Sequence, residues 1–154
     1  MANKNKESFS TEYERCRKIE AGISSREEAA ELCGMSIDKL ANIETEKTPA
    51  TPDDIIIMAE KYGTPSLYNY YCSQKCPIGK IWVPEITTSD ISDITIKILS
   101  ALNSIESEKN RLVEIVDDRE VSADEYADFD EIKDNLKRII ASANALLVWA
   151  EDNG

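Results

Sequence analysis

The chain of 154 residues contains no histidine, and this removes the most common general base, proton shuttle and metal ligand. It also contains no glycine-rich phosphate-binding loop and no nucleophile-elbow motif. Without these side chains and motifs, we expect that the protein is not an enzyme and that it requires no cofactor.

Long apolar runs are missing as well. No stretch approaches the roughly 20 consecutive apolar residues that span a bilayer, and the N-terminus is polar rather than signal-like. We therefore expect a cytoplasmic protein with no membrane partner. The four cysteines, Cys16, Cys33, Cys72 and Cys76, are expected to be thiols rather than a disulfide framework.

Glycine and proline are scarce, with five residues of each, whereas Glu, Lys, Ala, Leu and Ile are abundant. These abundant residues favour helices over strands. The length allows one or two small domains. Composition therefore predicts an all-α protein.

Positive charge is in short supply, since 18 Lys and Arg residues face 30 Asp and Glu residues. The net charge of −12 argues against a simple DNA-binding protein. However, residues 1–65 carry nine basic and thirteen acidic side chains, and residues 66–154 carry nine and seventeen. Because most of the acidity lies in the second half, the first half can present a local basic face. Its members would be Arg15, Arg17, Lys18, Arg26, Lys39 and Lys47.

Residues 22–46 are predicted to form two short helices joined by a tight turn. Ser24 precedes Glu27 by three residues, which is the pattern of a capping box at a helix start. Gly34 stands where a left-handed residue ends a helix most easily, so the first helix stops by Cys33. The small inward face of this helix would consist of Ala29, Ala30 and Leu32.

Ser36 can cap the second helix, whose buried positions would be Leu40 and Ile43, three residues apart. Two short helices joined by a turn with a glycine form a helix-turn-helix, whose second helix can lie in the major groove of DNA. The outward residues would be Ile37, Asp38, Lys39 and Asn42.

Three further short helices are predicted around this pair, which makes a five-helix domain. The first opens at Thr11 and ends near Gly22, with Tyr13, Cys16 and Ile19 inward. The fourth runs from the cap Thr51-Pro52 to Gly63. Its apolar face would be Ile55, Ile56, Met58, Ala59 and Tyr62, and a fifth helix would span residues 65–71.

The segment GISSREEAAELCGMS at 22–36, with Leu40, Ile43-Glu44, Pro49 and MAEKYG at 58–63, resembles the lambda-repressor-like, Xre-type family of bacterial regulators. The resemblance covers residues 12–65. It implies a sequence-specific DNA-binding transcriptional regulator, and we expect repression by a dimer that occupies its operator.

The resemblance also implies which side chains meet double-stranded DNA. Asn pairs with adenine, an apolar side chain touches the thymine methyl, and Asp accepts from cytosine. The base-contacting residues would be Ile37, Asp38 and Asn42, and the backbone-contacting residues would be Ser25, Arg26, Ser36, Lys39 and Lys47.

Two departures from the family pattern concern DNA affinity. Ser25-Arg26 stands where a Gln usually opens the helix, and Glu46 stands where a Gly usually follows Glu44 by two residues. Glu46 must therefore bend into the turn at some strain or let the helix end differently. It also adds negative charge near the expected backbone contact. The alternative function is an acidic protein-interaction module that keeps the fold without binding DNA.

Residues 68–88 are predicted to be an ordered connector rich in aromatic side chains. Cys72 and Cys76 would share one face of a helix, where they could bind a metal or form a strained bridge. Zinc would need two more ligands, from Cys16 and Cys33, from carboxylates or from a second subunit. The alternative, two half-buried thiols, is the one that we adopt, so no metal is expected and these cysteines are its only candidates.

Residues 89–154 are predicted to form two long amphipathic helices, the first of about 28 residues and about 40 Å. Residues 117–121 break the pattern, and Ser122 with Glu125 would cap the second helix. A short connection makes an antiparallel hairpin. The inward stripes would be Ile91, Ile94, Ile98, Leu102, Ile105, Leu112 and Val116, then Tyr126, Phe129, Ile132, Leu136, Ile139, Ala143, Leu146 and Ala150.

Further apolar residues lie beyond these stripes, and a second hairpin could cover them. We therefore expect a homodimer whose two-fold axis spaces two recognition helices. The alternative is a monomer in which the hairpin packs on its own amino-terminal domain. In this organisation residues 1–67 bind DNA, 68–88 connect and 89–154 dimerise. The additional apolar residues are Val113, Ile140, Leu147, Val148 and Trp149.

Overall fold

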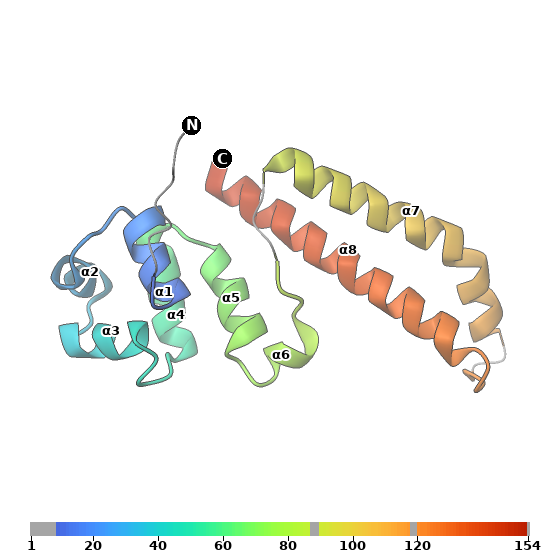
Figure 1. The fold of residues 1–154 in the computed structure, drawn as a ribbon, viewed down its shortest axis with the longest axis horizontal. Coiled ribbons are helices and arrows are strands. Elements are labelled where there is room, and N and C mark those ends of the chain that lie inside the picture. Colours follow the sequence, from blue (N-terminus) through green and yellow to red (C-terminus); the bar gives the residue numbers. More distant parts are fainter. Residues whose placement is uncertain (1–8, 87–89, 118–119, 154) are drawn as a thin grey trace. The chain divides into compact units, whose positions relative to one another are not determined.

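The computed structural model describes residues 9–86, 90–117 and 120–153, and these form helices with no strand among them (Figure 1). The all-α prediction is confirmed. The chain divides into two compact units, Met1–Gly79 and Lys80–Gly154. No helix within the described residues is long and apolar enough to cross a membrane.

The first unit contains a bundle of short helices around one apolar core. Its elements are α1 (Glu12–Arg15), the π-helical segment η1 (Cys16–Glu20), α2 (Arg26–Cys33), α3 (Ile37–Glu44), α4 (Pro52–Tyr62) and α5 (Ser66–Gln74). The short helix α6 (Gly79–Trp82) follows. The largest core side chains are Tyr13, Leu40, Ile43, Ile55, Met58, Tyr62 and Leu67.

The ends of these helices follow the chemistry of the caps. Ser36 Oγ accepts from the backbone N–H of Lys39 at 3.2 Å, and Thr51 forms a reciprocal capping box with Asp54. Gly34 and Gly63 close α2 and α4 with φ near 63°. These predicted starts and stops are confirmed.

The start of α2 differs by one residue from the prediction. Ser25, rather than Ser24, accepts from a backbone N–H, that of Glu28 at 3.1 Å. The carbonyl of Ser24 accepts instead from Arg17 Nη1 at 2.8 Å. That long-range bond holds Ser24 outside the helix, so the predicted capping box is wrong.

The first helix widens into a π turn at η1, where the Cys16 carbonyl accepts from the N–H of Ala21 at 3.0 Å. The extra residue in this turn rotates the helix face. Tyr13 and Cys16 are buried as expected, but Arg17 is buried next to them and Ile19 is 53% exposed. The prediction that Ile19 points inward is therefore wrong.

Two other inward assignments are also wrong, because short helices bury only a narrow face. Leu32 on α2 and Ile56 on α4 are exposed, whereas Ala29, Ala30 and Cys33 carry the buried face of α2.

Helix α5 extends to Gln74, beyond the predicted end at Tyr71. The first residues of the predicted connector are thus helical. Because Cys76 lies beyond the end of α5, it does not share a helical face with Cys72, and that premise of the metal hypothesis is wrong.

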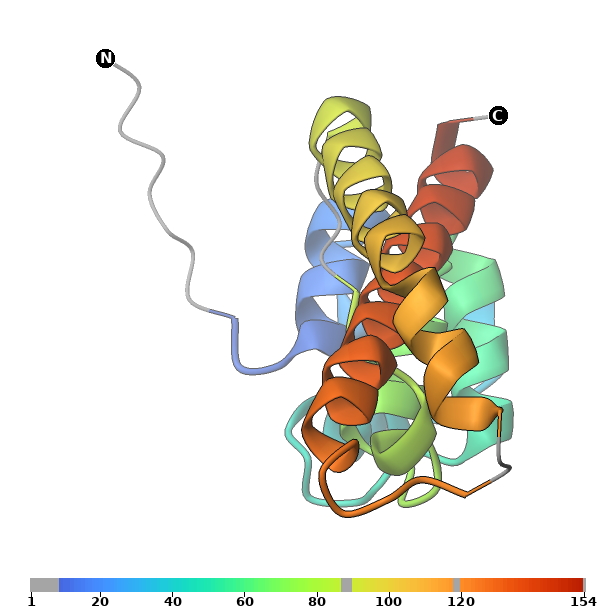
Figure 2. The same cartoon turned by 90° about the vertical axis from the view of Figure 1, so that its right-hand side faces the viewer.

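The second unit is an antiparallel hairpin of α7 (Ile91–Val116) and α8 (Tyr126–Asn153), which lie side by side in both views (Figures 1 and 2). The long helices and their hairpin are confirmed. Asp90 caps α7 by accepting from the N–H groups of Ser92 and Asp93. The predicted start at Ser89 and residues 118–119 of the predicted break lie outside the described residues.

The buried faces of the hairpin are narrower than the predicted stripes. Ile94, Ala101 and Ile115 of α7 are buried at spacings of seven and fourteen residues. Residues that repeat every seven positions face the partner helix along the length of a helix pair. Ile132 and Asn135 are buried on α8, and Asn135 Nδ2 donates to Glu108 Oε1 at 2.6 Å. The inward assignments of Ile91, Leu102, Val116, Tyr126, Leu136 and Ala150 are wrong, because all six are exposed.

Candidate nucleic-acid interface

The exposed side of α3 carries the residues predicted to read bases. Leu40 and Ile43 anchor the opposite side in the core. Ile37 and Asp38 are exposed in the first turn, and Asn42 is half-buried one turn further along. Ser36 is exposed, but its hydroxyl is engaged in the cap of α3.

A buried ionic cluster at the end of α3 fixes the position of this helix. Glu44 is fully buried, and its carboxylate accepts from Arg17 Nε at 2.5 Å and from Arg17 Nη2 at 3.0 Å. Arg26 Nε donates to the same carboxylate at 2.6 Å. We call Arg17, Glu44 and Arg26 the Glu44 cluster. It ties η1 and the first residue of α2 to the last residue of α3.

The burial of Arg17 in η1 is the largest difference between the prediction from the sequence and the structure. Arg17 was expected on a basic surface, but it is 1% exposed. Its bonds to Glu44 outweigh the desolvation and raise its pKa above the ordinary value. Its Nη1 also donates to the carbonyls of Ile23 and Ser24, which shapes the loop before α2. No local signal distinguished Arg17 from Arg15, since both adjoin buried Cys16 and only Arg17 is buried.

The other cations of the predicted basic face are also engaged. Lys39 Nζ lies 2.6 Å from Asp54 Oδ1 at the start of α4. Burial alone would raise the pKa of Asp54, but hydrogen bonds from Lys39 and Thr51 outweigh it and hold that pKa below its ordinary value. Arg15 pairs with Glu12 and Glu20, and Lys18 pairs with Glu14.

Lys47 is the remaining member of that basic face. It is exposed and makes no ion pair with any residue that the structure describes. The N–H of Lys47 donates to the carbonyl of Asn42 at 2.9 Å, which holds the turn against α3. Exposed carboxylates occupy α2 and the start of α3, at Glu27, Glu28, Glu31 and Asp38.

The turn that follows α3 resolves the question raised by Glu46. Its φ is 55°, so a side chain occupies the left-handed region that favours glycine. Lys75 lies at the end of α5, and its Nζ is 2.6 Å from Glu46 Oε1. The first of the two alternatives, a bend into the turn with some strain, is therefore confirmed.

The candidate residues are thus distributed along α3 and beyond both of its ends. Ser36, Ile37 and Asp38 lie at its N-terminus. At its C-terminus Glu44 pairs with Arg26, and Lys47 follows Glu44 by three residues. Ser25 is half-buried and caps α2. This arrangement can present short polar and apolar side chains to base edges, but it leaves little uncompensated positive charge for phosphates.

The cysteines of the first unit are thiols without a metal-binding constellation around them. No group of three or more Cys, Asp or Glu side chains could hold a metal ion within the described part of the chain. Burial, followed by the nearby charge of Glu12, raises the pKa of Cys16 to about 12. Cys76 Sγ accepts from the N–H of Gly79 at 3.4 Å.

Comparison with known proteins agrees with this geometry. No curated protein and no solved structure matches the chain. A family model described as helix-turn-helix, of the lambda-repressor-like kind, matches residues 14–69, from α1 into α5. That family is a DNA-binding regulatory one and is not typically enzymatic. The match supports residues 14–69 as the helix-turn-helix of a DNA-binding regulator in general.

Proposed function

We propose that the protein is a dimeric, cytoplasmic transcriptional regulator of bacterial type that represses by occupying a two-fold symmetric operator. The observation that carries the proposal is the helix-turn-helix match, together with a well-anchored α3 whose exposed side is available. In this proposal residues 1–67 bind DNA, residues 68–88 connect, and residues 89–154 dimerise.

The first two turns of α3 read the operator in this proposal. Ile37 contacts a thymine methyl, Asp38 accepts from cytosine N4, and Asn42 pairs with adenine. Ser25, Ser36 and Lys47 contact phosphates directly. Arg26 and Lys39 contribute only to the extent that DNA phosphates compete with Glu44 and Asp54 for them.

The exposed apolar residues of the hairpin support dimerisation. Leu99, Leu102, Val113 and Val116 each follow a buried or half-buried residue of α7 by one position, as Leu136, Ile140 and Leu147 do on α8. A residue one position after an interhelical contact is rotated by about 100° around the helix axis from that contact. Because α7 and α8 run antiparallel, the residues in this position on both helices lie on the same side of the hairpin. We call these seven residues the apolar face of the hairpin.

A second copy is the natural partner for the apolar face. Two hairpins that meet through it bury the same residues on both sides, as a two-fold interface requires. The product is a four-helix bundle, whose helices pack in the same way as α7 and α8. Glu106 and Lys109, which form an ion pair in the middle of α7, each follow a half-buried residue by one position as well, so this pair would lie within the interface.

The test is a selection of bound sequences from random duplex DNA at low salt, with the oligomeric state measured on the same protein. The proposal predicts a palindromic motif whose half-sites lie about one helical turn apart. If folded, dimeric protein enriches no sequence, the proposal is wrong.

A second candidate function is the acidic protein-interaction module. The engagement of Arg26 and Lys39 by Glu44 and Asp54 favours it, because Lys47 is the one member of the predicted basic face that makes no ion pair with a described residue. The two functions separate in the same selection, since the interaction module gives no enriched motif at any salt concentration.

A further inference from the structure

The first unit contains a cavity of about 410 Å³ next to the turn that follows α3. Tyr13, Ile43 and Ala50 form its buried floor. The rings of Pro49 and Pro77 contribute to its walls, so most of the lining is apolar. Such an enclosure, with a few polar groups at one edge, is typical of a small-molecule site.

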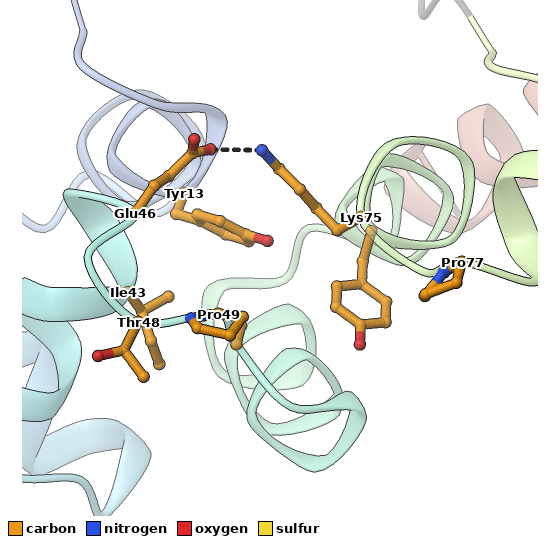
Figure 3. Close-up of a pocket in the computed structure, with 9 residues that line it drawn as sticks. Tyr13, Ile43, Glu46, Thr48, Pro49, Lys75 and Pro77 are labelled. Atoms are coloured by element: carbon orange, nitrogen blue, oxygen red, sulfur yellow. Dashed lines mark hydrogen bonds and ion pairs between the residues drawn. The ribbon is translucent and has the colours of Figure 1, made fainter.

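Two opposite charges lie at the edge of this cavity, Glu46 from the turn and Lys75 from the end of α5. Figure 3 shows their ion pair bridging the two elements, with the ring of Tyr13 beside it. No other charged side chain lines the cavity. A charged ligand would therefore compete for one member of this pair.

The charge distribution favours a cation as that ligand. Residues 1–65 carry thirteen acidic and nine basic side chains, and this excess of negative charge attracts cations and repels anions. Aromatic faces also bind ammonium groups, and Tyr13 and Tyr71 both line the cavity. Burial, followed by the charges of Tyr70 and Glu46, raises the pKa of Tyr13, so its hydroxyl stays neutral beside the cavity.

Lys75 has a second partner that makes its release from Glu46 inexpensive. Its Nζ lies 5.6 Å from the centre of the Tyr70 ring. That cation–π contact remains when a ligand takes the carboxylate, so Lys75 is not left without a favourable contact.

We propose that this cavity binds a small organic ammonium ion with a planar apolar body, whose ammonium group replaces Lys75 at Glu46. The planar body lies among Tyr13, Tyr71 and the two prolines. The ammonium group donates to the Glu46 carboxylate at the edge of the cavity.

Binding there acts on the turn after α3. Glu46 holds the left-handed conformation of this turn, and Lys47 is the next residue. A ligand that changes the partner of Glu46 therefore changes the position of Lys47, which makes no ion pair with a described residue. Only this second step rests on the proposed function, and linkage requires that DNA and ligand affect each other's affinity equally.

The test is calorimetry on the full chain without DNA, with tryptamine as the probe. Tryptophol and indole-3-acetate are matched neutral and anionic ligands with the same ring system. We expect tryptamine to bind at least about tenfold more tightly than either, a difference typical of one charge-assisted hydrogen bond. Equal binding of tryptophol and tryptamine would overturn the proposal.

Three variants locate the site. Glu46→Gln keeps the size of the side chain and should weaken tryptamine binding about tenfold or more, whereas Lys75→Met removes the competing cation and should strengthen it several-fold. Glu60→Gln, an exposed glutamate of α4 outside the cavity, is the matched control and should leave the affinity unchanged. An unchanged affinity in folded Glu46→Gln, or no binding by both the parent and Lys75→Met, would overturn the proposal. Because no DNA is present, failure here is distinct from failure to select an operator.

Discussion

Glu44 shows how one residue can determine the position of α3. Its carboxylate is fully buried and is matched by two guanidinium groups, one buried and one partly exposed. A buried carboxylate in this position needs counter-charges, and here three hydrogen bonds from the two guanidinium groups supply them. The same bonds join η1, α2 and α3, so the cluster converts an electrostatic match into a defined helix arrangement.

We expect Glu44→Gln to destabilise the first unit by about 3 kcal/mol, because it leaves the buried guanidinium of Arg17 without a counter-charge. Arg26→Gln should cost less than about 1 kcal/mol, since Arg26 is 35% exposed and water replaces the lost bond. Hydrogen exchange of amides in residues 12–62 measures both. Similar losses for the two variants would contradict the assigned roles.

A pH dependence is expected from Glu14, whose hydrogen bonds from Lys18 and then Ser10 lower its pKa to about 2. Because the folded-state pKa is below the ordinary 4.5, the stabilisation is complete above about pH 4.5 and is lost as the pH falls towards 2. Glu14→Gln should remove about 1–2 kcal/mol of stability at pH 7 and little at pH 2. Exchange protection measured at both pH values checks this, and a loss that is equal at the two values would exclude the mechanism.

At this scale the sequence predicted side chains whose role is local and missed those whose partner is distant. Ser36, Leu40 and Ile43 were assigned correctly, because a cap or a helix face needs only its neighbours. The burial of Arg17 depends on Glu44, 27 residues later, and on a π turn that no local pattern indicates. Electrostatic roles of single cations therefore could not be assigned from the sequence.

At the scale of the elements, the backbone of Gly79 after α5 lies close to the backbone of Cys72 within α5. A Cβ on Gly79 would lie 2.0 Å from the backbone carbonyl oxygen of Cys72. Backbone cannot withdraw as a flexible side chain can, so only glycine fits there. The segment after Cys72 is in this way held against the end of α5.

We expect Gly79→Ala to destabilise the junction between α5 and α6 by more than about 2 kcal/mol, because the backbone must shift. Gly34→Ala is the matched comparison, since a Cβ there meets open space and costs only the left-handed conformation, about 1–2 kcal/mol. Thermal unfolding of the two variants makes the comparison. If Gly79→Ala is the milder change, the close approach does not exist in solution.

The sequence predicted the elements well where periodicity extends over several turns. The long helices of the hairpin and the stops at Gly34 and Gly63 were found. The predicted inward stripes of the two long helices contained too many residues, because the sequence pattern does not distinguish an apolar residue in the narrow contact face from an apolar residue next to it. The π segment and the continuation of α5 depend on tertiary contacts, which periodicity does not report.

For the whole molecule, the apolar face of the hairpin should control assembly. Ile140→Glu places a charge in the proposed interface and should raise the dimer dissociation constant by at least about a hundredfold. Ile96→Glu is the matched control, because it is the same substitution at an isoleucine of α7 that is also exposed, 65% against 48% for Ile140, but lies outside the apolar face. Sedimentation equilibrium measures both, and a stable Ile140→Glu dimer would sink the proposed interface.

The salt dependence of DNA binding depends on how many phosphates the cations of the protein contact. The logarithm of the binding constant falls with the logarithm of salt by about 0.9 for each phosphate contacted. If only Lys47 of each protomer contacts phosphate, the slope of a dimer is about −2, and if Arg26 and Lys39 also leave their carboxylates, it is about −5. The ion pairs to Glu44 and Asp54 predict the shallower value, because a phosphate contact by Arg26 or Lys39 would have to replace an ion pair that already exists. Lys47→Ala should then remove most of the slope in a salt titration of the selected operator, whereas a parent slope near −5 would show that DNA opens both pairs.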